Sequence, residues 1–249
     1  MTAHASLQTS LNQDIVFVAK QKLTQAFHLF AMLDMDDLTY THLSVRHPQI
    51  PNHYFINPLG PIFEEMREDM LLEVNLEGNL IGNPKDNYNP TGDCIHKAIY
   101  NARPEVNAIM HLHTIDGVAV STLACGLLPI SQFALHFYNN IAYHDYNGLV
   151  LDALESKQLS KDLKHHNALI LRNHGLLTIG KTIEETFFLM YYLDQAAKTQ
   201  VKALSMNKDL QVPTDDICLK ASQQMRQFEP NLGSRDWDAL IRKLKRSKQ

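Results

Sequence analysis

The chain has 249 residues, of which 45% are hydrophobic and 20% are charged, and its formal net charge is −4 at pH 7. This composition is typical of one large or two small globular domains, and the negative charge argues against a general nucleic-acid-binding protein, which presents a basic face. No apolar run approaches the roughly 20 residues of a membrane-spanning helix, the N-terminus has no secretory pattern, and the three cysteines are widely spaced, so we expect a cytoplasmic protein with reduced thiols.

The first third of the chain predicts an arm, a helix and four short strands. Residues 1–13 are polar and unpatterned, which indicates a flexible N-terminal arm. From Asp14 to about Leu33, apolar residues recur at helical spacing and predict an amphipathic helix. Runs bounded by turn residues then predict strands at Thr39–Arg46, His53–Ile56, Leu71–Leu76 and Leu80–Ile81.

The middle of the chain alternates between helical and extended patterns. A loop rich in Pro, Asn and Asp leads into a helix from about Asp93 to Ala102, which Pro104 ends. We expect the following elements after it: a strand at Val106–His113, a helix at Asp116–Cys125, extended segments at Leu127–Ser131 and Ile141–Tyr146, a helix at Glu155–Lys164, and strands at Ala168–Arg172 and Leu176–Ile179.

Helices complete the chain. Thr182 and Glu185 have the spacing of a capping box, so a long helix is expected from Thr182 to about Met206. Two further helices are expected near Thr214–Phe228 and Asp236–Arg246. Because no internal repeat is present, we predict one α/β domain over residues 14–206 and a helical C-terminal appendage over residues 207–249.

Three histidines stand where two apolar strands are predicted to end. His111 and His113 are two residues apart on one strand, so their side chains point to the same face. His174, in the turn that ends another strand, can complete a three-nitrogen pocket with one metal coordination position open. The alternative is a histidine pair that only makes hydrogen bonds in the core, and the added Asn173-His174-Gly175 turn favours the metal site.

These motifs resemble the class II aldolase/adducin superfamily. The resemblance covers roughly Asp14 to Leu204 and rests on His111-x-His113, Leu169–Gly175 and the long terminal helix. It is closest to the adducin-like bacterial branch, through the segments Thr41–Arg46, His96–Pro104, Gly126–Ser131 and Ala142–Gly148. The resemblance implies a three-layer αβα fold with a central, mostly antiparallel sheet flanked by helices, assembled as a homo-oligomer and commonly a tetramer with active sites between subunits.

The same resemblance implies a zinc site. In the sugar-phosphate aldolases of this family, the zinc ligands fall on His111, His113 and His174 of this chain. One Zn²⁺ per subunit is implied, although another divalent metal is possible. Such an ion polarises a carbonyl or stabilises an enediolate, so a small-molecule substrate is implied as well.

The chain departs from the family's catalytic pattern. The acid/base glutamate of the aldol-cleaving members falls on Gly92, which cannot transfer a proton, and a family tyrosine falls on Phe133. The family's phosphate-binding residues fall partly on Thr41-His42 and on Pro90, and proline removes a backbone donor. A sugar-derived or keto acid is therefore a better expectation than a phosphorylated sugar.

Replacement acid/base chemistry is expected from the segment Tyr143-His144-Asp145-Tyr146. We take His144 and Tyr146 as candidate catalytic residues, because a histidine can act as a general base near pH 7. The alternative is a strand that packs two tyrosines while His144 and Asp145 fix a corner.

Two arginines and one further histidine remain open. Arg46 and Arg172 can each bind a carboxylate through two hydrogen bonds or can pair structurally. His42 either lines the pocket or lies on the surface.

Three functions follow from these residues. The first is a metal-dependent carbon–carbon lyase that stabilises an enolate, and the intact histidine set favours it. The second is a non-enzymatic adducin-like scaffold, which the missing glutamate favours. The third is an iron-dependent oxygenase, which ranks last because no carboxylate joins the three histidines.

Overall fold

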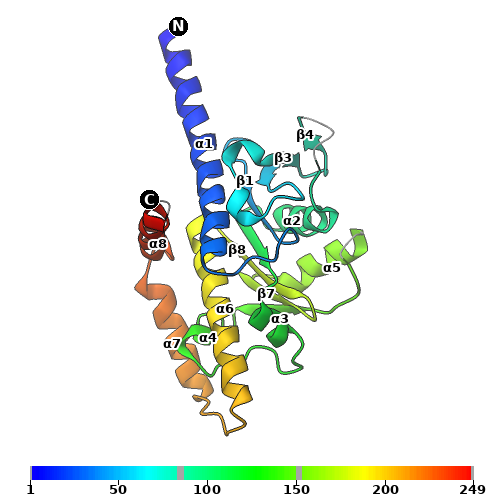
Figure 1. Ribbon diagram of the computed structural model, residues 1–249, viewed down its shortest axis with the longest axis vertical. Helices are drawn as coiled ribbons and strands as arrows, with labels where there is room; N and C mark the ends of the chain where they lie inside the picture. The colour runs from blue at the N-terminus through cyan, green and yellow to red at the C-terminus, as the bar shows by residue number, and fades with distance from the viewer. Residues whose placement is uncertain (1, 83–86, 150–152, 248–249) are drawn as a thin grey trace.

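A computed structural model describes residues 2–82, 87–149 and 153–247, and the side chains from residue 14 onward within these ranges. Its centre is a mixed sheet of eight strands in the order β4-β3-β2-β1-β5-β8-β7-β6 (Figure 1). All neighbouring strands run antiparallel except β6 and β7, which are parallel. Helices flank this sheet, so the predicted α/β architecture with a mostly antiparallel sheet is confirmed.

The strands lie where alternating or apolar runs predicted them. Their bounds are His42–Arg46 (β1), His53–Ile56 (β2), Leu72–Asn75 (β3), Leu80–Ile81 (β4), Ala108–Leu112 (β5), Ile141–His144 (β6), Ala168–Leu171 (β7) and Gly175–Gly180 (β8). The extended segment predicted at 127–131 is a correction, because it joins no strand. The amide of Gln200 instead accepts from Leu128 N at 2.7 Å and donates to Gly126 O at 2.8 Å, which satisfies this loop without a sheet partner.

Every predicted helix is present, but two of them start clearly earlier than predicted, the helix predicted up to Cys125 ends at Ser121, and a short helix at Gln132–Leu135 and two 3₁₀ turns were not predicted. Their bounds are Thr2–Met32 (α1), Pro90–Ala102 (α2), Ile115–Ser121 (α3), Gln132–Leu135 (α4), Ala153–Leu163 (α5), Ile183–Ser205 (α6), Asp215–Phe228 (α7) and Ser234–Ser247 (α8), with 3₁₀ turns at Phe63–Glu65 (η1) and Glu68–Met70 (η2). Residues 2–13 belong to the region predicted as a flexible arm without a helical pattern; their backbone continues α1 from Thr2 onward, and they contain no Pro or Gly to interrupt a helix.

The second corrected starting point is that of α2, the helix that precedes the strand with His111. Helix α2 begins at Pro90, three residues before the predicted start. Proline is suited to the first helical position because its missing N–H would have no partner there. The side chain of Asn89 caps the helix by accepting a hydrogen bond from Thr91 N at 3.0 Å. This places Gly92 in the first turn of α2.

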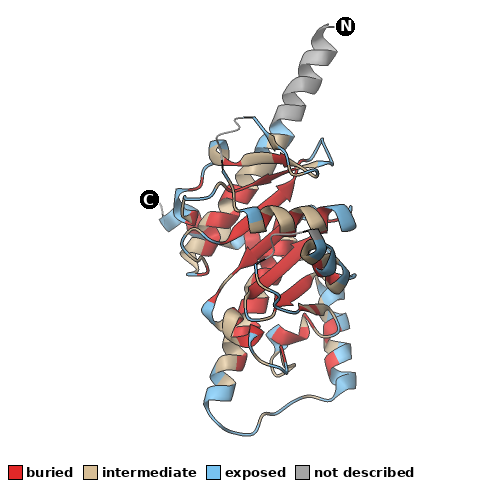
Figure 2. Ribbon diagram, turned by 90° about the vertical axis from the view of Figure 1, so that its right-hand side faces the viewer, coloured by how far each residue is buried: buried red, intermediate tan, exposed pale blue. Residues whose placement is uncertain are grey.

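Both faces of the sheet are covered. Helices α1 and α6 cover one face, and α2 and α5 cover the other (Figure 1). Along β5, Met110 and Leu112 join the cluster that includes α1 and α6, whereas Ile109 joins the cluster with α2 and α5. The inner strands are consequently buried along their whole length, as the red strands of Figure 2 show. A strand buried on both faces positions its side chains rigidly.

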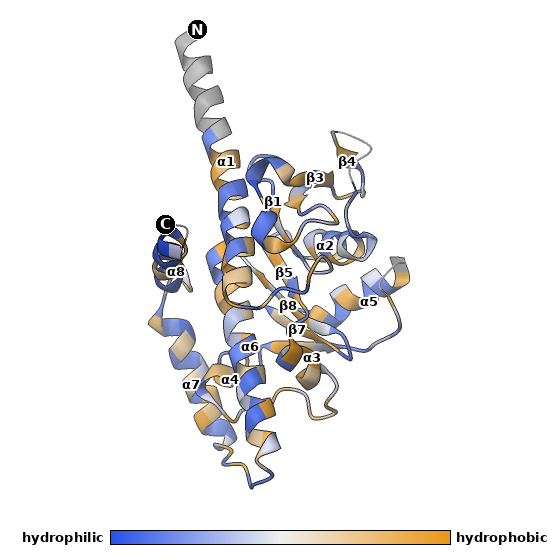
Figure 3. Ribbon diagram, viewed as in Figure 1, coloured by the Kyte–Doolittle hydropathy of each residue, from blue (hydrophilic) through white to orange (hydrophobic). Residues whose placement is uncertain are grey.

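The C-terminal helices contribute to the same core. Helix α8 is mostly hydrophilic (Figure 3), but Trp237 and Leu244 on its inner side belong to the α1–α6 cluster. The Trp237 ring lies edge-on to Phe187 of α6, with centroids 5.5 Å apart. The basic residues near the end of α8 are exposed, as in a solvated helix face. None of the described helices is both long and apolar enough to span a membrane.

The tryptophan contact gives a test of how firmly α8 is attached. Trp237→Ala should lower the free energy of unfolding by roughly 3–5 kcal/mol, because a large buried ring leaves a cavity. Phe228→Ala is the matched control, since that ring is 78% exposed and should cost less than about 1 kcal/mol. Urea unfolding followed by circular dichroism measures both. Equal losses in the two variants would mean that α8 is not part of the cooperative core.

Candidate metal centre

The three predicted ligands meet at the ends of neighbouring strands. His111 lies in β5, His113 follows the end of that strand, and His174 lies in the turn between β7 and β8. Asn173 makes this turn tight through a positive φ of 56°. Gly175 then lets β8 approach β5 closely, because a Cβ there would lie 2.6 Å from Leu112 O.

The Nε2 atoms of the three histidines form a small triangle. The sides measure 2.9 Å between His113 and His111, 3.0 Å between His113 and His174, and 3.2 Å between His111 and His174. Three nitrogens bound tetrahedrally to one zinc ion at about 2.0–2.1 Å lie roughly 3.3–3.4 Å apart. The triangle is therefore close to the size that a single bound ion requires, and among the described residues it is the one group of at least three ligands that fits an ion.

The hydrogen bonds on the far side of two rings define their tautomers. His111 Nδ1 is 3.0 Å from Leu176 O, and His113 Nδ1 is 2.9 Å from a carboxylate oxygen of Asp37. A carbonyl and a carboxylate only accept, so both Nδ1 atoms carry the proton. Both Nε2 atoms consequently present lone pairs to each other, an arrangement that a cation between them would stabilise.

Burial keeps His111 and His174 neutral near pH 7. Loss of solvation lowers the pKa of His111 well below its ordinary value, and the neighbouring His113 and His174 lower it further. Burial followed by the charge of His113 lowers the pKa of His174 to about 4. Metal ions bind the neutral imidazole, so neither ligand has to lose a proton at neutral pH.

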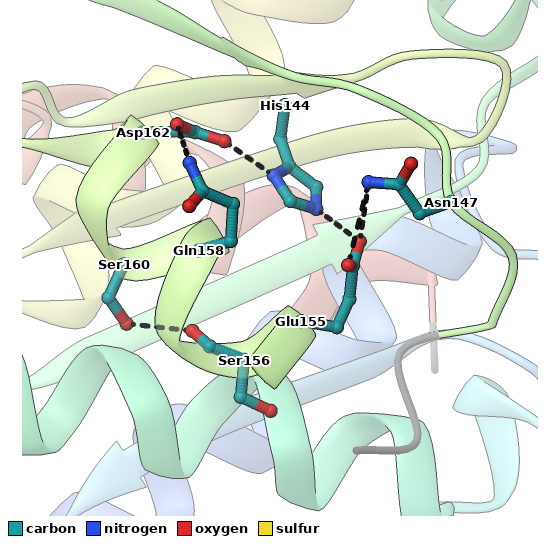
Figure 4. Close-up of polar contacts among 7 residues, drawn as sticks. All are labelled: His144, Asn147, Glu155, Ser156, Gln158, Ser160 and Asp162. Carbon is teal, nitrogen blue, oxygen red and sulfur yellow. Dashed lines mark hydrogen bonds and ion pairs between the residues drawn. The ribbon is translucent and has the colours of Figure 1, made fainter. Parts of the chain in front are cut away.

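His144 occupies a different position from the one expected of a catalytic base. Its Nδ1 is 2.7 Å from Asp162 and its Nε2 is 2.8 Å from Glu155, both in α5 (Figure 4). Asn147 also contacts Glu155. Both ring nitrogens are therefore occupied, and this geometry favours the alternative in which His144 fixes a corner between β6 and α5.

Tyr146 remains near the site. It is exposed and lines a small cavity together with His174 and Arg172. Arg172 donates to Leu123 O at 2.6 Å and stacks on the ring of Tyr143 at 4.4 Å, so part of its role is structural.

The contacts of Arg46 are structural. Its guanidinium is buried, donates to the carbonyls of Val106, Pro51 and Tyr100, and stacks on the Tyr100 ring. A guanidinium satisfied in this way holds the chain together and is not available to bind a carboxylate.

Two contacts of the site were not predicted from the sequence. Asp37, in the loop after α1, orients His113 although 76 residues separate them. His42 and His96 form a buried pair on the same side of the sheet as His111. These contacts depend on how the loop after α1 and helix α2 lie against the sheet, which local sequence patterns do not show.

Comparisons with known proteins identify the family of this chain. The model of the Class II Aldolase and Adducin N-terminal domain matches residues 21–201. A proposed aldolase class 2 protein of Caulobacter vibrioides is 37% identical over 229 residues, covering 92% of this chain and 89% of its own. Alpha-adducin of Rattus norvegicus is 38% identical over 187 residues, 74% of this chain but 25% of the longer adducin.

Solved structures show the same fold. An aldolase II superfamily protein from Pseudomonas syringae superposes with a TM-score of 0.87 at 37% identity, covering 93% of this chain and 94% of that one. An L-fuculose 1-phosphate aldolase from Glaciozyma antarctica gives a TM-score of 0.84 at 28% identity, with coverage of 95% and 92%. From the matched domain and these relatives, the chain belongs to the class II aldolase and adducin family.

Proposed function

We propose that this protein is a metal-dependent carbon–carbon lyase that acts on a small oxygenated substrate such as a sugar-derived or keto acid. The observation that supports this proposal is the Nε2 triangle of His111, His113 and His174, with sides of 2.9–3.2 Å. Zn²⁺ is the proposed ion, because three neutral imidazoles leave a fourth tetrahedral position for a substrate oxygen. When bound, the ion supplies Lewis-acid polarisation of that oxygen.

The surrounding residues keep the ligands in place for this chemistry. Leu176 O and Asp37 fix two rings in the tautomer that metal binding needs. The strands β5 and β8 hold these groups within a sheet that is buried on both faces. A preorganised ligand set loses little conformational entropy on binding an ion.

The start of α2 supports a keto acid over a phosphorylated sugar. Pro90 supplies no backbone donor, and the hydroxyl of Thr91 already donates to Asn89 at 2.8 Å. Few donors therefore remain here to surround a phosphate group.

An adducin-like scaffold without catalysis is the second candidate. The observation that favours it is Gly92, which stands where the family's acid/base glutamate is expected. A scaffold has no requirement for a converging nitrogen triangle, so the retention of all three histidines supports the lyase. The three-histidine set also ranks the iron-dependent oxygenase last, because its usual site has two histidines and one carboxylate.

We also propose a cytoplasmic homotetramer. Two apolar side chains beside the metal centre are exposed to solvent in the single chain, Leu38 at 70% and Ile115 at 84%. Their burial in a subunit contact would stabilise an oligomer. Sedimentation equilibrium should give four times the chain mass of 28.4 kDa, and a monomer at micromolar concentration would contradict this assembly.

Metal binding is the direct test of the proposed function. The purified protein should contain one zinc per chain by elemental analysis, and His111→Ala, His113→Ala and His174→Ala should each lose it. Asp37→Ala should still bind zinc but with roughly 10- to 100-fold lower affinity in chelator competition, because it removes only a hydrogen bond to a ligand. His165→Ala, an exposed histidine elsewhere, is the control.

Three results would separate the candidates. Turnover of any acid in a panel of hydroxy and keto acids would support the lyase. Stoichiometric zinc without turnover would favour the scaffold, and absence of stoichiometric metal would contradict both the zinc site and the lyase.

The buried histidines predict acid sensitivity of the metal-free protein. Burial lowers the pKa of His96 to about 3 and that of His174 to about 4, so the unfolded state binds more protons below about pH 6.5. The free energy of unfolding should therefore be highest above pH 6.5 and fall as the pH decreases toward 4. At pH 5 each such histidine should remove roughly 2 kcal/mol.

Urea unfolding of chelator-treated protein at pH 7 and pH 5 measures this loss. His96→Gln should show a smaller decrease between the two pH values than the wild type, because one buried imidazole is gone. Equal stability of the wild type at both pH values would contradict the prediction.

A further inference from the structure

His42 lies beside the metal centre without being one of its ligands. It faces His111 directly across the β1–β5 ladder, so the two side chains share one face of the sheet, and their ring centroids are 4.9 Å apart. The ligand atoms of the metal site lie within 4.8 Å of one another, and His42 is not part of that set. Its ring is 2% exposed. His42 is therefore a neighbour of the coordination site.

One nitrogen of His42 is anchored in a buried polar chain. His42 Nδ1 is 2.8 Å from His96 Nε2, and His96 Nδ1 contacts the hydroxyl of Ser44. Ser44 Oγ is 2.9 Å from the hydroxyl of Tyr100, which lies 3.4 Å from Asn107 O. The four side chains come from β1 and α2 and are almost fully buried.

The other nitrogen of His42 is free. Within the described parts of the chain, Nε2 has no hydrogen-bond partner, and it is not among the unpartnered atoms that are enclosed in the protein. Gly92 provides the space around it, because a Cβ at that position would lie 3.0 Å from Cδ2 and 3.3 Å from Nε2 of this ring. Because this nitrogen keeps some accessibility and has no partner in the protein, it is available to hydrogen-bond a small molecule next to the metal centre.

The polar chain can run in two directions. In one, Tyr100 donates to Ser44, Ser44 to His96 and His96 to His42 Nδ1, which leaves the proton of His42 on Nε2. In the other, every donor and acceptor is reversed, Tyr100 donates to Asn107 O, and Nε2 presents a lone pair. Both arrangements satisfy the chain, and neither changes its net charge.

The ring acts in both arrangements as a neutral group. Burial lowers the pKa of His42 well below its ordinary value, and His96, His113 and His174 lower it further. An oxygen of a ligand therefore meets a neutral donor or acceptor at Nε2.

We propose that His42 is a ligand-binding residue whose Nε2 hydrogen-bonds an oxygen of the small hydroxy or keto acid at the metal centre. The chain through His96, Ser44 and Tyr100 lets Nε2 donate to a carbonyl or carboxylate oxygen, or accept from a hydroxyl. This inference rests on the proposed metal-dependent function and assigns part of its substrate recognition to a side chain outside the metal ligands.

Two substitutions separate the nitrogens of His42. The amide of asparagine lies near the position of Nδ1, so His42→Asn keeps a partner for His96 and removes the ligand-facing group. The amide of glutamine lies near Nε2, so His42→Gln keeps that group and gives up the bond to His96. His165→Asn is the control, because His165 is exposed.

The experiment compares zinc content, thermal stability and glycolate affinity of the zinc-loaded full chain. All four proteins should bind one zinc per chain. By calorimetry, His42→Asn should bind glycolate roughly two- to tenfold more weakly than the wild type, as expected for the loss of one hydrogen bond. His42→Gln should bind glycolate more tightly than His42→Asn although it loses more thermal stability. If glycolate affinity depended only on thermal stability, His42→Gln would bind glycolate more weakly than His42→Asn. That result would overturn the inference.

The remaining outcomes distinguish the two proposals. Equal glycolate affinity in the wild type and His42→Asn, with zinc bound to both, would overturn the role of His42 and leave the metal site intact. No glycolate binding by the zinc-loaded wild type would also overturn it. Absence of zinc from the wild type would overturn the proposed function and this inference together.

Nuclear magnetic resonance of ¹⁵N-histidine-labelled protein gives a readout that a structural role would not change. Glycolate should shift the Nε2 resonance of His42, which is assigned by its loss in His42→Asn. Ser44→Ala interrupts the polar chain and should change the ratio of the two His42 tautomers without changing zinc content. An Nε2 resonance that does not respond to glycolate would contradict the proposal.

Discussion

The close approach of β8 to the end of β5 is the constraint on which the site depends. Leu112 pairs with Leu176 in the ladder, and Gly175 lies against Leu112 O where a side chain would not fit. His111 immediately precedes Leu112 and His174 immediately precedes Gly175, so their positions follow from the register of two strands buried on both faces. Because a close-packed sheet deforms little, it restrains the positions of these two histidines.

Two polar contacts connect segments that flank the sheet to histidines of the site. Asp37 joins the loop after α1 to His113, and His96 joins α2 to His42. The first contact is partly exposed, whereas the second is fully buried. Hydrogen bonds are stronger away from water, so the α2 contact orients its histidine more firmly than the loop does.

Local patterns predicted the elements and the ligands, and long-range contacts explain the differences. Alternation along one strand predicted that His111 and His113 point to the same face, and this prediction needs no knowledge of the fold. His144 looked available as a base because nothing in its own segment shows that α5 brings Glu155 and Asp162 to both ring nitrogens. The pairing of His42 with His96 spans 54 residues and depends on how α2 lies across β1.

The family resemblance places a glutamate at the position of Gly92, and under the proposed function this difference affects the charge of the site as well as its shape. The ring of His42 lies against Gly92, so a neutral imidazole takes the space beside the ligands. A divalent ion held by three neutral histidines keeps its full positive charge, and no carboxylate stands at Gly92 to offset it. Attraction between opposite charges is strong where water is partly excluded, so such a site favours an anionic substrate. A hydroxy or keto acid supplies both the charge that the ion attracts and the oxygens that His42 can bind.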